Sequence, residues 1–330
     1  MQSKNNLIDL LQKFQKSYYF IFKAITLLGI LVSLYFSLKK EQQSLWNIRD
    51  VLAESISFKN SLLLGLCCVL LFLNWGLEAK KWQVLSRKIE QISYKDAFEA
   101  VLVGITLSFV TPVNLGDYAG KIWKLNVKNK LESIGAILLG NGIQFYVSMF
   151  WGSASFIYLY YFKFDSSSFI TNVLLFIMLF CFVLGLLFFC KPAILADFFK
   201  QFKALDVFQK YLKVIKLYTF GDIVQLFLFT TLRYLTFSIQ YILLLILFGV
   251  NLPMLDIFAV TNMVFYCKTL VPAVNFISDI GVREISSIYF FNLYQINTSK
   301  VVLATLLLWL INLLFPAILG FYYILKIKQK

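Results

Sequence analysis

The 330-residue sequence contains no histidine. This absence excludes Ser-His-Asp and Cys-His nucleophilic sites, and it equally excludes a metal ion or haem held by imidazole. The five cysteines occur within apolar runs and show no C-x-x-C spacing; they are Cys67, Cys68, Cys181, Cys190 and Cys267. Because cysteines in such runs are typical of small buried side chains, we expect neither a disulfide framework nor a metal site.

Motifs for nucleotides and for metal-dependent catalysis are also missing. The sequence has no G-x-x-x-x-G-K-[ST] phosphate-binding loop, no aspartate-rich metal motif and no nucleophile with a partner base. We therefore expect no catalytic residues and no cofactor. Any movement that the protein drives must draw on a gradient, a partner or a concentration difference.

Polar stretches of domain size are absent too, because the chain is 60% hydrophobic and only 15% charged, with a mean hydropathy of +0.76. No soluble domain could bury this much apolar surface, so we predict an all-α polytopic integral membrane protein. Residues 1–330 form one transmembrane domain with approximate halves at 61–162 and 222–325. Six runs are long enough to cross about 30 Å of hydrocarbon: Tyr18–Leu38, Ser61–Leu77, Ile134–Phe162, Phe169–Cys190, Ile223–Val250 and Val301–Leu325.

The net charge of +14 does not indicate nucleic-acid binding, because the bases cluster just beyond the apolar runs. With a cytoplasmic N-terminus, 21 of the 31 bases fall in inner segments, 8 in outer segments and 2 within spans. This bias predicts that both termini lie in the cytoplasm. We interpret Tyr18–Leu38 as a retained first helix, since it is too long for a cleaved signal peptide.

Two basic segments between the runs have apolar residues at helical spacing. These segments, Glu78–Lys95 and Lys191–Gly221, are predicted to form amphipathic helices in the cytoplasmic headgroup layer.

Two further apolar stretches, Ala100–Gly116 and Ile257–Ser278, break before they can cross the membrane. Each stretch leads into a motif with Pro, Asn, Asp and Gly followed by a base, which ends at Lys121 in the first case and at Arg283 in the second. Asp-x-Phe stands at the same distance before the proline in both. We predict two re-entrant helical segments that approach from opposite faces, as in an inverted repeat. Such paired, interrupted segments in two halves of a chain indicate a transport site near the bilayer midplane.

In the first break, Pro112 removes a backbone donor and stops the incoming helix. Gly116 and Gly120 have the small-xxx-small spacing that permits close helix approach, and Asp117 and Lys121 are spaced to form an i,i+4 ion pair. With Asn114, these polar groups either bind a headgroup in a lipid pathway or form a capped cytoplasmic turn.

The second break holds Arg283, whose guanidinium is suited to bidentate phosphate binding. Asp279 or Glu284 would hold it in place, and Lys268 lies unusually deep in the preceding apolar run. The alternative is an outer loop with a local ion pair. The candidate substrate-pathway residues in this half are Lys268, Pro272, Asn275, Asp279, Gly281, Arg283 and Glu284.

Arg233 lies well inside the fifth run, where a charge indicates a functional site by default. Its structural alternative is a pair with Asp117 or Asp279. Asn141 and Gln144 in the third run either line the same cavity or connect helices by hydrogen bonds.

At the two breaks the chain resembles the transmembrane, flippase-like region of lysylphosphatidylglycerol synthases, the multiple peptide resistance factor family. The matching stretches are Lys81-Trp82, Thr111-Pro112…Gly116-Asp117…Lys121 and Pro272…Gly281-Val282-Arg283-Glu284. The resemblance implies a polytopic inner-membrane protein with a lipid-translocating role and a central cavity. The chain departs from the family by having Lys81, Asn114 and Lys121 where arginine is common, and Phe276–Asp279 in place of a glycine-rich lead-in.

The resemblance does not extend to the aminoacyl-transferase domain, so lysyl transfer is not implied. We predict a non-enzymatic transporter that moves a membrane lipid with an anionic or glycosylated headgroup between leaflets. One alternative is a lipid-phosphate transferase that uses Asp117, Asp279 or Glu284 as acids or bases. The other is an accessory scaffold whose partners are cell-envelope enzymes.

Overall fold

The computed structural model describes residues 50–55, 57–111, 115–125, 131–164, 167–190, 213–271 and 276–327. These residues are almost entirely helical and include no strand, which confirms the all-α prediction. The helices are α3 (Phe58–Ser86), α4 (Tyr94–Val110), α5 (Leu115–Trp123), α6 (Leu131–Phe162), α7 (Phe169–Cys190), η3 (Lys213–Leu217), α10 (Phe220–Leu247), α11 (Met254–Leu270), α12 (Phe276–Asn292), α13 (Thr298–Trp309), η4 (Leu310–Leu314) and α14 (Phe315–Ile327). The predicted run Tyr18–Leu38 lies outside the described residues.

Within the described residues, five segments are long and apolar enough to cross a membrane: Phe58–Ser86, Glu132–Phe162, Phe169–Leu186, Phe220–Leu247 and Thr298–Lys326. They coincide with the five predicted runs that the structure describes. The last span joins α13 to α14 through the π-helical turn η4. Pro316 follows this turn. A proline removes one backbone N–H donor from a regular helix and its ring needs extra space, and a π-turn accommodates both changes.

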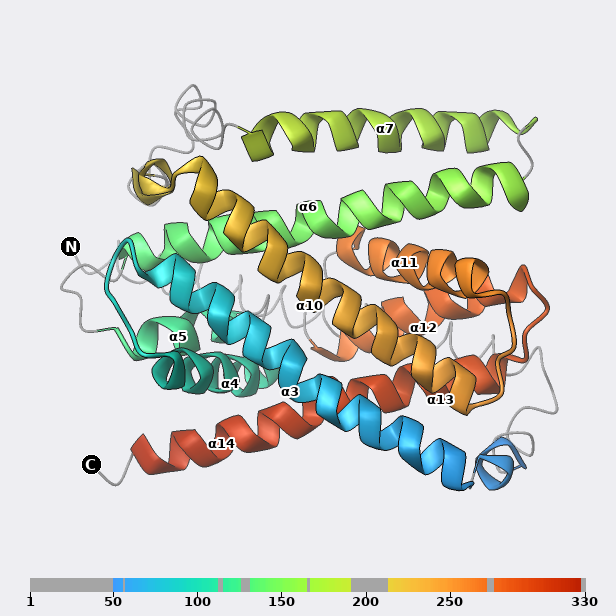
Figure 1. Cartoon of the computed structure of the whole chain (residues 1–330), viewed down its shortest axis with the longest axis horizontal. Helices are drawn as coiled ribbons and strands as arrows, with labels where there is room; N and C mark the ends of the chain where they lie inside the picture. The colour runs from blue at the N-terminus through green and yellow to red at the C-terminus, as the bar shows by residue number, and fades with distance from the viewer. Residues whose placement is uncertain are drawn as a thin grey trace, which may run out of the picture.

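On either side of each predicted break one helix ends and another begins, and the two helices pack on each other; these pairs, α4/α5 and α11/α12, are called hairpins below. The first helices of the hairpins, α4 and α11, have 17 residues each and end just before 112–114 and 272–275, which lie outside the described residues. Pro112, Asn114, Pro272 and Asn275 therefore have no described position, and the same holds for the side chain of Asp279. The hairpins α4/α5 and α11/α12 lie at opposite ends of the long axis (Figure 1).

The aspartates of the repeated Asp-x-Phe motif have equivalent places in the two hairpins. Lys124, just after α5, donates to Asp96 Oδ1 near the start of α4 at 3.0 Å. Tyr294, just after α12, donates to Asp256 Oδ1 near the start of α11 at 2.8 Å, and Tyr158 of α6 donates to the same oxygen at 3.1 Å. Each aspartate thus connects the start of the first helix of its hairpin to a residue just after the second helix.

Glycines allow α5 to lie directly on α4, as the small-xxx-small spacing predicted. A Cβ added at Gly116 would overlap the backbone of Leu107 and Ser108, and one at Gly120 would overlap the backbone of Gly104. The close contact fixes the position of the polar residues that share α5 with these glycines.

The predicted surface helix Glu78–Lys95 is corrected by the structure. Helix α3 continues nine residues beyond the predicted run, to Ser86, and Lys81 and Trp82 are among its buried residues. A charged stretch can stay inside the protein here because its charges have partners of opposite sign. Most of the second predicted surface helix, residues 191–212, lies outside the described residues, and η3 follows it.

Gly120→Val should destabilise the protein, because the added side chain has no space against Gly104. Overpacking of this kind costs about 1–3 kcal/mol or more. The unfolding midpoint in detergent measures the effect. Gly65→Ala is the control, because a Cβ at Gly65 meets no atom within 4 Å. Equal midpoints for both variants would contradict the close α4–α5 contact.

Candidate functional site

A cavity of about 430 Å³ lies among the helices, and both hairpins contribute to its wall. Its polar lining comes from α3 (Asn74, Glu78), α4 (Ser108), α5 (Asp117, Tyr118, Lys121), α6 (Asn141, Gln144, Ser148), α10 (Arg233, Tyr234), α11 (Lys268, Thr269), α12 (Arg283) and η4 (Asn312). Aromatic and aliphatic side chains such as Trp75, Phe237 and Phe265 complete the wall. The cavity therefore combines polar and charged groups with an apolar surround.

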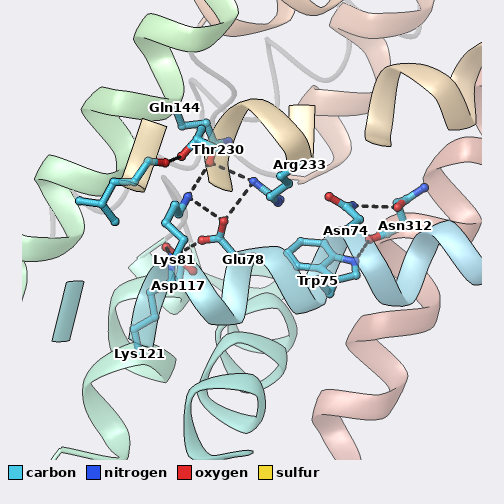
Figure 2. A network of polar contacts seen from close by, with 11 residues as sticks. Asn74, Trp75, Glu78, Lys81, Asp117, Lys121, Gln144, Thr230, Arg233 and Asn312 are labelled. Atoms are coloured by element: carbon cyan, nitrogen blue, oxygen red, sulfur yellow. Dashed lines mark hydrogen bonds and ion pairs between the residues drawn. The ribbon is translucent and has the colours of Figure 1, made fainter. Parts of the chain in front are cut away.

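Glu78 is the centre of the charged network in this cavity (Figure 2). Its carboxylate lies 2.6 Å from Lys81 Nζ, 3.0 Å from Lys121 Nζ and 3.2 Å from Arg233 Nη1. Lys121 also pairs with Asp117 at 2.9 Å. One carboxylate on α3 thus joins cations from α3, α5 and α10.

Neutral groups add contacts to two of these cations, although Arg233 Nε has no hydrogen-bond partner among the described residues. Gln144 Oε1 accepts from Lys81 Nζ at 3.1 Å and from Arg233 Nη1 at 3.0 Å. The guanidinium of Arg233 also lies over the Trp75 ring, 4.9 Å from its centroid. Since charges removed from water are costly unless paired and hydrogen-bonded, these contacts are what make the buried network tolerable.

The network carries an excess of positive charge. Three cations surround the two carboxylates of Glu78 and Asp117, and Lys268 and Arg283 add two more bases to the cavity wall. Among the described residues that line the cavity there are four bases and two acids. The cavity is therefore suited to an anionic group.

A second polar contact lies where the last span has its π-turn. Asn74 Nδ2 donates to Asn312 Oδ1 at 3.0 Å, and Trp75 Nε1 donates to the Asn312 carbonyl oxygen at 3.0 Å (Figure 2). The π-turn places Asn312 toward α3, consistent with the frequent occurrence of such turns at functional sites.

Several predicted residues meet in this cavity. Asp117, Lys121, Arg233, Lys268 and Arg283 all line it, and the predicted Asp117–Lys121 pair is present. Among the described side chains, the acid that pairs with Arg233 is Glu78 and not the predicted Asp117. The other predicted partner, Asp279, has no described side chain. Asn141 and Gln144 also line the cavity, as one of their two interpretations required.

The remaining described candidates lie outside the cavity wall. Gly116 is buried against α4, so its role is helix packing. Gly281 and Glu284 are buried in α12 without being part of the lining.

Sequence reasoning missed Glu78, Asn74 and Asn312. Glu78 and Lys81 lie in the segment predicted to be a surface helix, because that segment combines clustered bases with apolar residues at helical spacing. The available signal was the helical spacing of Leu71, Trp75, Trp82 and Leu85, which continues past the end of the apolar run and predicts that this side of the helix stays buried.

The model of the lysylphosphatidylglycerol synthase TM region family matches residues 20–320. The chain belongs to this family. The matched range includes every residue of the cavity wall, and the family indicates a membrane protein of lipid-related processes. No curated protein and no solved structure matches the chain.

For this lysylphosphatidylglycerol synthase TM region protein, Glu78→Gln should cause a large loss of stability. It removes the shared partner of three cations, and breaking a buried ion pair costs about 3–5 kcal/mol. Asp117→Asn should cost about 1 kcal/mol or less, because the Asp117 side chain is 26% exposed and Lys121 keeps its contact with Glu78. Denaturant unfolding in detergent measures both, and an equal loss would show that Glu78 is not the centre.

Proposed function

We propose that this protein moves an amphipathic lipid between membrane leaflets. The headgroup passes through the central cavity while the acyl chains stay in the bilayer. The observation that carries this proposal is that both broken hairpins meet at one charged cavity: Asp117 and Lys121 come from α5, Lys268 from α11 and Arg283 from α12. Polar groups and irregular backbone at membrane depth are tolerated where they line such a cavity.

The arrangement of the hairpins supports an inverted repeat. The connection from α3 to α4 lies at one end of the molecule, and the connections from α10 to α11 and from α12 to α13 lie at the other (Figure 1). Helix α4 packs on α14, and its counterpart α11 packs on α6. In this proposal the two hairpins re-enter from opposite faces, with the basic α3–α4 connection in the cytoplasm of a cell with a bacterial-type inner membrane.

Binding fits the cavity better than acid–base catalysis. The acids on its wall, Glu78 and Asp117, already contact cations at 3.2 Å or less, so they serve as counterions. Glu284, the other candidate acid with a described side chain, does not line the cavity. We therefore favour transport without a chemical change in the lipid.

Reconstitution tests this function. Liposomes with acyl-labelled lipids report leaflet exchange as the fraction of label that an impermeant quencher reaches. The wild type should accelerate exchange, and Asn141→Trp should abolish the acceleration, because the indole would occupy the cavity that Asn141 lines.

Leu66→Trp is the matched control, since Leu66 is an exposed side chain of α3 outside the cavity. It should exchange lipid like the wild type. Equal exchange in all three proteins and in empty liposomes would reject transport. A covalent change in the recovered lipid would instead favour the transferase alternative.

A further inference from the structure

The charged groups of the cavity differ in how far their hydrogen-bonding capacity is used. Lys81, Lys121 and Arg233 each contact Glu78, and Lys121 has a second carboxylate. Arg283 is only 2% exposed, yet its Nε and Nη2 atoms have no hydrogen-bond partner within the described part of the chain. It lines the same cavity from α12.

These two nitrogens are a matched pair of donors. The Nε–H and the adjacent Nη2–H point the same way along one edge of the guanidinium plane. Together they form the fork that binds two oxygens of a phosphate or carboxylate. The unused part of Arg283 is therefore the edge that carries out bidentate oxyanion recognition.

Leaving such donors unpaired costs free energy. The cost of an unsatisfied buried donor is larger when the group is charged. A protein gains nothing in stability from this arrangement, so a ligand that supplies two acceptor oxygens is the simplest reason for it.

The rest of the cavity defines the net charge of that ligand. In the part of the wall that the structure describes, bases are twice as many as acids, so a positive charge on the headgroup would meet repulsion. A neutral sugar would leave the fork without an anionic partner.

We propose that Arg283 seats the phosphate of the transported lipid, and that the substrate class is a phospholipid with a net negative headgroup. This inference rests on the proposed transport function and names its substrate. The headgroup phosphate accepts from Nε and Nη2 of Arg283. Lys121 and Arg233 stabilise its charge from the other wall of the cavity.

The first arm of the test compares three acyl-labelled lipids in the exchange assay: phosphatidylglycerol, phosphatidylcholine and glucosyl diacylglycerol. The wild type should move phosphatidylglycerol fastest. Arg283→Gln should slow phosphatidylglycerol about tenfold or more, since a charge-assisted hydrogen bond contributes about 1.5–3 kcal/mol. Arg283→Lys should keep part of the rate, because it retains the charge and loses the fork. Arg87→Gln is the control, since Arg87 is exposed at the end of α3.

The second arm measures binding alone, as the unfolding midpoint in a neutral detergent. Dihexanoyl phosphatidylglycerol should stabilise the wild type and not Arg283→Gln, by the linkage of ligand binding to folding. Without added lipid, Arg283→Gln should be at least as stable as the wild type, because it removes a buried charge with unpaired donors.

The outcomes separate the two proposals. If the wild type exchanged none of the three lipids, transport would be rejected. The binding arm would still show whether Arg283 binds the phosphate. Equal exchange rates for the glycolipid and phosphatidylglycerol would overturn the assignment of Arg283 as the phosphate-binding residue, while the transport proposal would stand. Equal stabilisation of Arg283→Gln and the wild type by dihexanoyl phosphatidylglycerol would have the same consequence. Stabilisation of the wild type by inorganic phosphate to the same extent as by dihexanoyl phosphatidylglycerol would overturn the assignment to a lipid.

Discussion

The Glu78 carboxylate is the contact on which the centre of this protein depends. It is buried in α3 and binds cations from three helices, so it determines how α3, α5 and α10 meet. Without it, Lys81 and Lys121 would be nearly fully buried ammonium groups with too little opposite charge. The same contact explains why the membrane-crossing part of α3 can include a stretch that composition alone assigns to the surface.

The two hairpins have the same arrangement of helices and of the aspartate contact, but their charged residues differ. In each, an aspartate at the start of the first helix contacts a residue just beyond the second, Lys124 in one case and Tyr294 in the other. The polar residues that the hairpins bring to the cavity differ, however. Asp117 and Lys121 on α5 pair with each other, whereas Arg283 on α12 keeps two donors unused. A repeated backbone frame thus supports two chemically different walls of one cavity.

Much of this arrangement could be predicted because it is local in sequence. The apolar runs predicted five spans, prolines and polar residues predicted the breaks, and i,i+4 spacing predicted the Asp117–Lys121 pair. The Glu78 network could not be predicted in the same way, since Glu78 and Lys121 are 43 residues apart and no local pattern joins them. Hydropathy also counts a charged residue as polar whether or not it is paired, and for this reason the predicted span ended nine residues before α3 does.

Transport requires that a headgroup bind in the cavity and then leave it, and an internal counterion serves the second requirement. A wall of unpaired bases would hold an anion tightly and release it slowly, because affinity differences are expressed mainly in the dissociation rate. Glu78 and Asp117 compete with an incoming anion for Lys121 and Arg233, so the anion gains only the difference between two similar interactions. Arg283 has no such competitor at its open fork within the described residues. In the proposed transport it would therefore select the headgroup, while the Glu78 network would keep the remainder of the path weakly binding.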